Sequence, residues 1–270
     1  MITGHSKQWF ERSGIDYYMS FVRTWIAFNS WYMHHFTLND ESDRAYINEI
    51  KNTDNQFRNR IMTLLKASNE DEESKCFKKN LGLLHEELEK RAIPKYDTRV
   101  TFTNIDIGIS SNTVINEAFD GMTYKVERYT SGSTRPNKQV DCVIINSKGQ
   151  TKLIITQAKY NLFEFMNHSD YLKHNSENQK KKLLEFYRKI NPRKVVNLVY
   201  DNTSKKNDYI ELTERTKFKN NIDDIAVGLI EIIYSLRCKI FHGELEPSWN
   251  NMKIYEYAFN ILSLLLKQTY

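Results

Sequence analysis

An arginine and a histidine stand close together in the segment LRCKIFHG near the end of the sequence, where Arg237 is followed by His242. Arginine carries a permanent charge on a planar group that binds phosphate oxygens, and histidine is the side chain that titrates near neutral pH. This combination suits cleavage of an RNA backbone, because an imidazole can move protons while a guanidinium stabilises the charge that builds on the phosphate. Such a reaction requires no metal ion and no other cofactor, and we expect neither.

The end of a helix must position this pair. Residues five apart on a continuous helix are rotated by about 140°, so Arg237 and His242 converge only if the helix ends between them. Gly243 and Pro247 predict such an end, since glycine readily adopts the left-handed conformation just beyond a helix and proline prevents early resumption. The negative end of the helix dipole also favours a protonated histidine. The alternative is structural: Arg237 pairs with a nearby carboxylate such as Glu244, and His242 merely caps the helix.

Helical periodicity dominates both ends of the chain. Between residues 16 and 36 apolar side chains recur every three or four positions, which predicts one helix with a buried face. Two or three further helices are predicted between residues 41 and 91, and Pro94 marks their end. Two long helices flank the LRCKIFHG segment, one before it and one after Pro247. The apolar positions of the first helix are Phe21, Trp25, Phe28 and Tyr32.

The middle of the chain has a different texture, in which short β-branched or aromatic runs are separated by turn sequences such as SGSTRPNK and SKGQ. The predicted fold class is α+β. An antiparallel helical bundle is formed by both chain ends, residues 1–95 and 213–270, and a small mixed α/β segment is inserted at 96–212. Within the insertion we predict strands at 124–130, 139–146 and 151–160, a helix at about 176–190 and an apolar run at 194–200.

Three features together resemble the HEPN family of helical domains: the apolar helix that ends in Arg237 and His242, the helix after it, and the aromatic segment YYMSFVRTWIAFNSWY (17–32). The hallmark of that family is an R-x(4–6)-H motif at the end of an inner helix. The resemblance covers roughly residues 10–93 and 213–270. It implies a HEPN-like bundle that forms a homodimer and brings two Arg/His pairs into one cleft.

The resemblance also implies an activity and partners. HEPN proteins are frequently metal-independent endoribonucleases that act as toxins or in antiviral defence against phage, so RNA is the expected substrate and an antitoxin protein a further expected partner. In this role His242 is the general acid or base, and Arg237 stabilises charge on the phosphate. The family commonly has asparagine after the arginine, where this chain has Cys238. A non-catalytic RNA- or nucleotide-binding module is therefore the alternative interpretation.

A second constellation lies in the predicted insertion. Asp141 precedes Gln157 and Lys159, which end an apolar strand, and this D…Q-x-K arrangement resembles the motif of PD-(D/E)xK nucleases. In those enzymes an acid binds Mg²⁺ and the lysine supports the attacking water. Gln157 and Lys159 would share one face of a strand, and Glu117 and Glu127 are the candidates for a second acid. A second nuclease activity in the insertion, of the PD-(D/E)xK type, is therefore an alternative function. The other interpretation is that these are ordinary strand-end residues, and we expect the insertion to recognise substrate.

Two further groups of residues are candidates for binding or ordering. The segment NQKKKLLEFYRKINPRK crowds basic side chains around Phe186 and Tyr187 and could contact phosphates, and a solvated helix face is the alternative. Asn29 on the aromatic helix is expected to order a turn or a backbone group, because a buried amide must be hydrogen-bonded. The candidate nucleic-acid-binding residues are Lys180, Lys181, Lys182 and Arg188.

Composition limits the remaining possibilities. The net charge of +5 permits a polyanionic partner without requiring one. Cys76, Cys142 and Cys238 form no close pair, and no Cys/His spacing suggests a metal site. No segment is apolar enough to span a membrane, and the N-terminus lacks the apolar core of a signal peptide. We therefore expect a cytoplasmic protein with no membrane partner.

Overall fold

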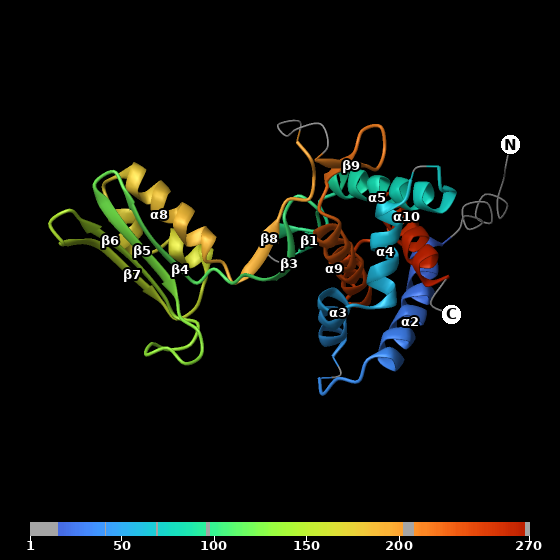
Figure 1. Cartoon of the computed structure of the whole chain (residues 1–270), viewed down its shortest axis with the longest axis horizontal. Helices are drawn as coiled ribbons and strands as arrows, with labels where there is room; N and C mark the ends of the chain where they lie inside the picture. Colours follow the sequence, from blue (N-terminus) through green and yellow to red (C-terminus); the bar gives the residue numbers. More distant parts are fainter. Residues whose placement is uncertain (1–15, 41, 69, 96–97, 202–207, 268–270) are drawn as a thin grey trace, which may run out of the picture. The chain divides into compact units, whose positions relative to one another are not determined.

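The structure is a computed structural model that describes residues 16–40, 42–68, 70–95, 98–201 and 208–267. Its fold class is α+β: helices come from both ends of the chain, and antiparallel strands come from the middle (Figure 1). The chain divides into two compact units, the first formed by Met1–Ile107 with Val196–Tyr270 and the second by Gly108–Val195. Among the described residues, no helix is both long and apolar enough to cross a membrane.

The helices of the first unit each begin at a polar residue whose side chain accepts a hydrogen bond from a backbone N–H of the first turn. Such an N-cap satisfies a donor that the helix itself cannot satisfy. The predicted helices at both chain ends are confirmed, and three of them lie between residues 41 and 91. The helices are α2 (Tyr17–His35), α3 (Asp43–Asn52), α4 (Gln56–Lys66), α5 (Glu72–Lys90), α9 (Ile222–Phe241) and α10 (Trp249–Leu266).

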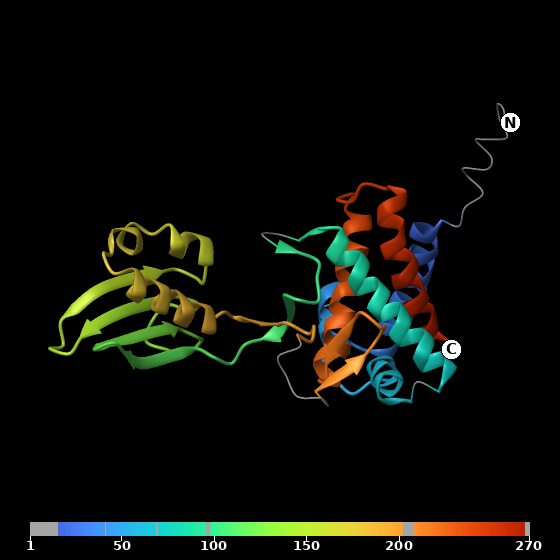
Figure 2. The same cartoon turned by 90° about the horizontal axis from the view of Figure 1, so that it is seen from above.

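One hydrophobic core holds these helices together. Helix α10 packs against α2 and α5 (Figure 2), and α9 packs against α3 and α4. The apolar face of α2, from Phe21 to Tyr32, is buried in this core as predicted. The hydroxyl of Tyr255 on α10 donates a hydrogen bond to the carbonyl of Leu236 on α9 at 3.0 Å. Because helices from both chain ends share this core, the two ends must fold together.

Short hairpins extend the core of the first unit. Phe102, Leu198 and Phe218 are buried among the helices although they lie outside them. The inserted unit is therefore shorter than the predicted 96–212, because the chain on both sides of it stays packed on the helical core. The paired strands are β1 (Pro94–Lys95) with β2 (Thr98–Arg99), and β9 (Tyr209–Glu211) with β10 (Lys217–Lys219).

The second unit is an antiparallel sheet in the order β4-β5-β6-β7, with α8 packed against β5 and β6. Alternate side chains of the sheet form a separate core with Leu183, Phe186 and Tyr187 of α8. Strand β4 was not predicted, because its sequence VINEAF has no alternation of apolar and polar residues; every side chain except that of Ile115 is exposed. The elements are β4 (Val114–Phe119), β5 (Met122–Arg128), β6 (Val140–Asn146), β7 (Thr151–Gln157), α6 (Leu162–Met166), α7 (Ser169–Lys173) and α8 (Glu177–Lys189).

The chain leaves the first unit along β3 (Ile105–Ile109) and returns along β8 (Arg193–Val196). These two strands pair with each other in a two-stranded sheet. Just beyond them, the Ser110 N–H donates a hydrogen bond to the Pro192 carbonyl at 2.9 Å. The chain therefore departs and returns at adjacent positions, as an insertion into a folded unit requires.

Candidate functional site

Helix α9 ends where the sequence predicts, in a turn that satisfies its last carbonyl groups. Gly243 has a φ of +65°, and its N–H donates to the Ile240 carbonyl at 3.1 Å. The N–H of Glu244 donates to the Lys239 carbonyl at 3.0 Å. This pair of hydrogen bonds is the Schellman arrangement, which requires a left-handed residue at the glycine position. His242 is the C-cap residue, and its side chain is exposed.

Arg237 is anchored toward α2 and α3. Its Nη2 lies 2.5 Å from Oδ2 of Asp43, the first residue of α3. Its guanidinium carbon lies 4.4 Å from the centre of the Phe241 ring and 5.8 Å from that of Trp25. Glu244, the partner considered from the sequence, pairs with Lys239 instead. A carboxylate from a distant helix therefore fixes Arg237.

Asp43 is itself held by two side chains of α2. Its Oδ1 accepts hydrogen bonds from Nδ2 of Asn29 at 3.1 Å and from the hydroxyl of Tyr32 at 2.8 Å. Asn29 also donates to the Tyr32 hydroxyl. Burial and the bond to Asp43 raise the pKa of Tyr32, so the hydroxyl keeps its proton and remains a donor. Asn29 was expected to order a turn or a backbone group, and it orders the carboxylate that binds Arg237.

Arg237 and His242 occupy different sides of α9. The helix runs through Phe241 and does not end between them, so the two positions are about 140° apart. Arg237 faces α2 and α3, whereas His242 is exposed to solvent. In the described part of the chain no hydrogen bond or ion pair joins the two side chains. The convergence that the sequence suggested is therefore not made within one chain.

A buried charge cluster lies on α9 before the motif. Glu231 is 3% exposed, and its carboxylate is bound by Arg44, Lys51 and Lys95 at distances of 2.8, 3.0 and 3.1 Å. Lys95 also donates to the Ser235 hydroxyl at 2.9 Å. Burial by itself raises the pKa of Glu231, but the three cations outweigh it and hold the pKa at about 2. Sequence reasoning missed this cluster.

The candidate metal motif of the second unit does not assemble. Gln157 pairs in register with Val140 and is buried, where it accepts a hydrogen bond from Tyr187 at 2.5 Å. Asp141 pairs with Thr156 and accepts a hydrogen bond from its hydroxyl on the opposite face of the sheet. Side chains of successive residues in a strand point to opposite faces. Asp141 and Gln157 therefore do not meet.

Lys159 does not share a face with Gln157 as predicted, because β7 ends at Gln157 and Lys159 lies in an exposed bend beyond it. Glu117 and Glu127 stand on neighbouring strands, and Glu127 pairs in register with Asp141. Among the described residues, no group of three or more histidine, cysteine, aspartate or glutamate side chains could hold a metal ion. The strand-end interpretation fits these positions.

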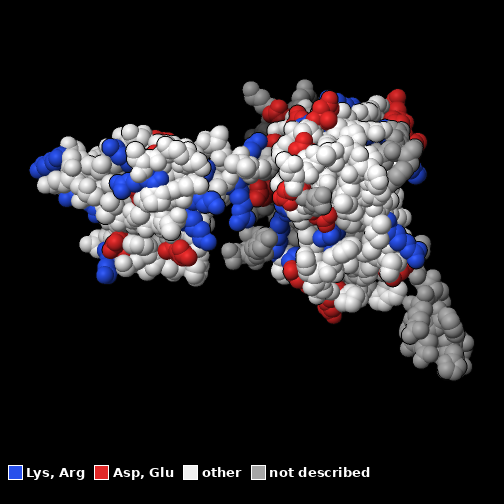
Figure 3. All heavy atoms as spheres, turned by 90° about the horizontal axis from the view of Figure 1, so that it is seen from below, with Lys and Arg blue, Asp and Glu red and all other residues white. Residues whose placement is uncertain are grey.

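The basic segment forms α8, and its cations differ in how far they are neutralised. Lys180 pairs with Glu177, and Lys182 pairs with Glu185 at 2.8 Å. Lys181 and Arg188 are both exposed, and they lie seven positions apart on the same side of the helix. Basic side chains are spread over the visible face of the second unit (Figure 3). Lys181 and Arg188 are therefore the better placed of the four candidates for contact with phosphate.

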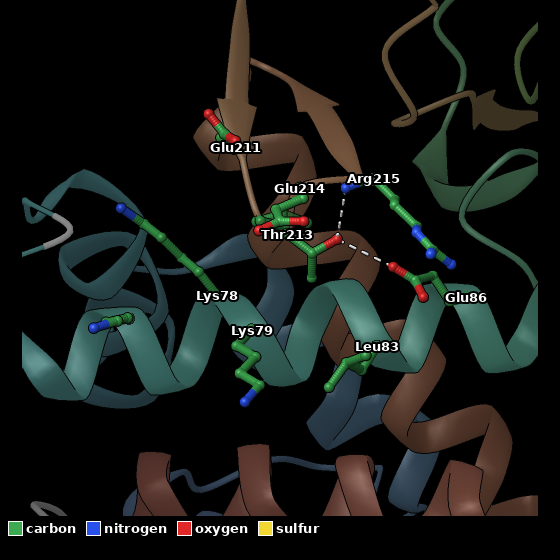
Figure 4. A pocket seen from close by; sticks show the side chains of 10 residues that line it. Lys78, Lys79, Leu83, Glu86, Glu211, Thr213, Glu214 and Arg215 are labelled. Carbon is green, nitrogen blue, oxygen red and sulfur yellow. Dashed lines mark hydrogen bonds between the residues drawn. The ribbon is translucent and has the colours of Figure 1, made fainter.

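A pocket of about 630 Å³ lies between α5 and the β9–β10 hairpin of the first unit (Figure 4). The hydroxyls of Thr213 and Thr216 donate hydrogen bonds to Glu86 at 3.0 and 2.9 Å, which fastens the hairpin to α5. The charged side chains that line the pocket are three lysines and Glu86 on α5 and Glu211, Glu214 and Arg215 on the hairpin, and none of the residues predicted from the sequence lines the pocket. These contacts give the hairpin a structural role.

The residues brought together are thus Asn29, Tyr32, Asp43 and Arg237, whereas His242 lies at the C-cap of α9 on a different side of the helix. The chain matches no protein-family model, no curated protein and no solved structure.

Proposed function

We propose that the chain is a metal-independent endoribonuclease of the HEPN type, which acts as a toxin or a phage-defence effector in the cytoplasm. One observation carries the proposal: an arginine fixed by a partly buried network lies five positions before an exposed histidine at the C-terminus of an apolar helix. The anchored Arg237 offers a preorganised positive charge, and the exposed His242 can reach a substrate. RNA supplies both an anionic backbone and a 2′-hydroxyl that needs a base.

In the proposed reaction the 2′-oxygen attacks the adjacent phosphorus, and the bond from phosphorus to the 5′-oxygen breaks. One imidazole accepts the 2′-hydroxyl proton, and another delivers a proton to the departing 5′-oxygen, so the products are a 2′,3′-cyclic phosphate and a 5′-hydroxyl. The guanidinium stabilises the negative charge that builds on the phosphate oxygens. A homodimer supplies the two imidazoles and the two guanidinium groups.

The surface of α2 supports the dimer. Met19, Ile26 and Met33 are exposed and stand seven positions apart, which aligns them in one row on the helix. An apolar row on a helix beside the Arg237 network suits a second copy of the chain, since burial of such a row stabilises association. Sedimentation should show a dimer at tens of micromolar, and a monomer there would contradict this part of the proposal.

The test is cleavage of single-stranded RNA in the presence of EDTA. Wild-type protein should cleave, whereas His242→Ala and Arg237→Ala should each abolish cleavage. Arg58→Ala is a matched control, because Arg58 pairs with Asp223 at the other end of α9 and its side chain is 19% exposed against 18% for Arg237. His34→Ala controls for removal of an exposed histidine. Equal activity in all four variants would overturn the proposal.

A second candidate function is an RNA- or nucleotide-binding module without catalysis. It is favoured by Cys238 at the position where the family commonly has asparagine, and by the commitment of Arg237 to Asp43 on a different side from His242. Cys238→Asn discriminates the two. If neither wild type nor Cys238→Asn cleaves RNA, while both shift it in a gel with strong salt dependence, the binding function holds.

A further inference from the structure

One side of α9 carries a row of polar side chains that leads away from His242. Glu231, Ser235, Cys238 and His242 are spaced by four, three and four positions, so they follow one another along the same side of the helix. A rise of about 1.5 Å per residue makes this row about 16 Å long. Arg44 and Lys95 reach the row at its far end, on Glu231. Glu231 and Ser235 are buried, so a strand of RNA cleaved at His242 would meet this end of the row through the partly exposed side chains of Arg44 and Lys95.

The guanidinium of Arg44 is bound by Glu231, and the Arg44 side chain is also partly exposed. Its two Nη atoms lie 2.8 and 3.2 Å from the two oxygens of Glu231, and its guanidinium carbon lies 4.1 Å from the centre of the Tyr234 ring. The Arg44 side chain is 44% exposed, whereas that of Glu231 is 4% exposed. A guanidinium has five N–H donors, and this pairing uses two of them. The carboxylate is thus sealed while part of the guanidinium faces solvent in a fixed orientation.

Two lysines bind the Glu231 carboxylate and differ in how far their side chains are exposed. The Nζ of Lys95 lies 3.1 Å from Glu231 and donates to the Ser235 hydroxyl, and 22% of its side chain is exposed. The Nζ of Lys51 lies 3.0 Å from Glu231, but its side chain is 5% exposed. Three cations and one carboxylate give these four groups a net charge of +2. The side chains of Arg44 and Lys95 are therefore partly accessible to solvent, whereas that of Lys51 is not, and Lys95 also has an interaction beyond those with Glu231 and Ser235.

We propose that Arg44 and Lys95 form a phosphate-binding subsite for single-stranded RNA, which holds a backbone phosphate of a nucleotide that flanks the cleavage point. The inference rests on the proposed function, and it adds the direction in which the substrate extends, from His242 toward Arg44 and Lys95. Glu231 acts as a positioning residue, because it orients both cations and does not touch the ligand. Fixed cations bind phosphate at a smaller entropic cost than mobile ones.

The test measures binding separately from cleavage. Full-length His242→Ala protein is titrated with a labelled oligouridylate, and the dissociation constant is followed by fluorescence anisotropy over a series of salt concentrations. Adding Lys95→Met or Arg44→Gln should weaken binding several-fold at low salt. Each should also reduce the slope of log affinity against log salt by about 0.7, the loss of one contact to a single strand.

Lys51→Met is the matched control, because it removes a lysine from the same carboxylate without removing an accessible charge. It should lower the denaturation midpoint and leave the salt slope unchanged once the folded fraction is measured by circular dichroism. Equal slopes for Lys51→Met and Lys95→Met would overturn the subsite. If wild type cleaves and the slopes do not change, the subsite fails and the nuclease stands. If the slopes change and wild type does not cleave, the subsite stands and the nuclease fails.

Discussion

Asp43 sets the orientation of the Arg237 guanidinium. Its two oxygens serve different partners, since Oδ1 accepts from Asn29 and Tyr32 and Oδ2 binds the guanidinium. The two side chains of α2 therefore fix the orientation of the Asp43 carboxylate that binds Arg237. The Nε atom of Arg237 is buried and has no hydrogen-bond partner in the described part of the chain. The ion pair with Asp43 is the polar contact that sets the direction of the guanidinium.

Asp43→Asn should therefore impair both stability and cleavage. The substitution removes the negative charge beside a partly buried guanidinium, so the free energy of unfolding should fall by about 1–3 kcal/mol. RNA cleavage at saturating substrate should fall toward that of Arg237→Ala, because the guanidinium loses its fixed orientation. Urea unfolding and cleavage rates provide the measurements. Asp223→Asn is the control: Asp223 is 63% exposed, so its loss should cost less than about 1 kcal/mol and leave cleavage intact.

At this scale the sequence predicts part of the candidate site. Arg237 stands out because an arginine and a histidine end an apolar helix, and Asn29 because an amide on an aromatic helix needs a partner. Asp43 does not stand out, since an acidic residue in the first turn of a polar helix is common and also favours the helix dipole. Its role depends on the packing of α3 against α9, which local periodicity does not encode.

Two ion pairs of opposite polarity join helices α3 and α9. Asp43 and Arg44 are neighbours on α3 and have opposite signs, and they bind Arg237 and Glu231 of α9. An exchange of the two contacts would place carboxylate against carboxylate and guanidinium against guanidinium. Glu231 is buried and Arg237 is largely buried, so such a mismatch would be costly, and the two ion pairs favour the observed register of the helices. The same pairing that orients Arg237 thus also positions Arg44.

The Glu231 cluster predicts how stability depends on pH. The pKa of Glu231 falls from 4.5 to about 2 in the folded chain, because the surrounding cations outweigh burial. A depressed folded pKa contributes stability that is complete above the unfolded pKa and is lost as pH falls through the folded one. We expect the free energy of unfolding to fall by about 3 kcal/mol between about pH 5 and pH 2 through this group.

Urea unfolding at a series of pH values measures this effect, with Glu231→Gln as the comparison. The variant should be less stable at pH 6, since Lys51 and Lys95 lose their carboxylate, and its stability should fall less steeply below pH 5. Glu244→Gln is the control, because Glu244 is exposed and its pKa is also lowered, by Lys239. Parallel curves for wild type and Glu231→Gln would refute the assignment.

Element by element, the sequence predicts what has a strong local signal. Apolar spacing finds every long helix, and Gly243 finds the end of α9. Apolar spacing fails for β4, because its exposed side chains show no alternation of apolar and polar residues. It also fails for the border at residue 96, because the local sequence pattern changes there although the chain stays packed in the helical core. Tertiary contacts such as those of Phe102 and Phe218 decide which unit a segment joins.

On the scale of the whole molecule, two hydrophobic cores remain separate. The core of the helices is built from residues on both sides of the insertion, whereas the core of the sheet is built from residues within it. Each unit can therefore fold around its own apolar side chains. Under the proposed function, the first unit carries the reacting residues Arg237 and His242, and the second unit would contact the RNA backbone through Lys181 and Arg188.

This division predicts that the second unit can be removed without loss of the chemistry. The hydrogen bond between Ser110 and Pro192 brings these residues together, so an Asn-Gly turn can replace residues 111–191. The shortened chain should unfold cooperatively and cleave saturating RNA at the wild-type rate, but its KM should rise at low salt, because phosphate contacts position a substrate without entering the reaction. An unchanged KM in the shortened chain would show that the second unit does not recognise the substrate.

In the full chain, Lys181→Ala with Arg188→Ala should raise KM more than Lys180→Ala with Lys182→Ala, because the ammonium groups of Lys180 and Lys182 already have carboxylate partners.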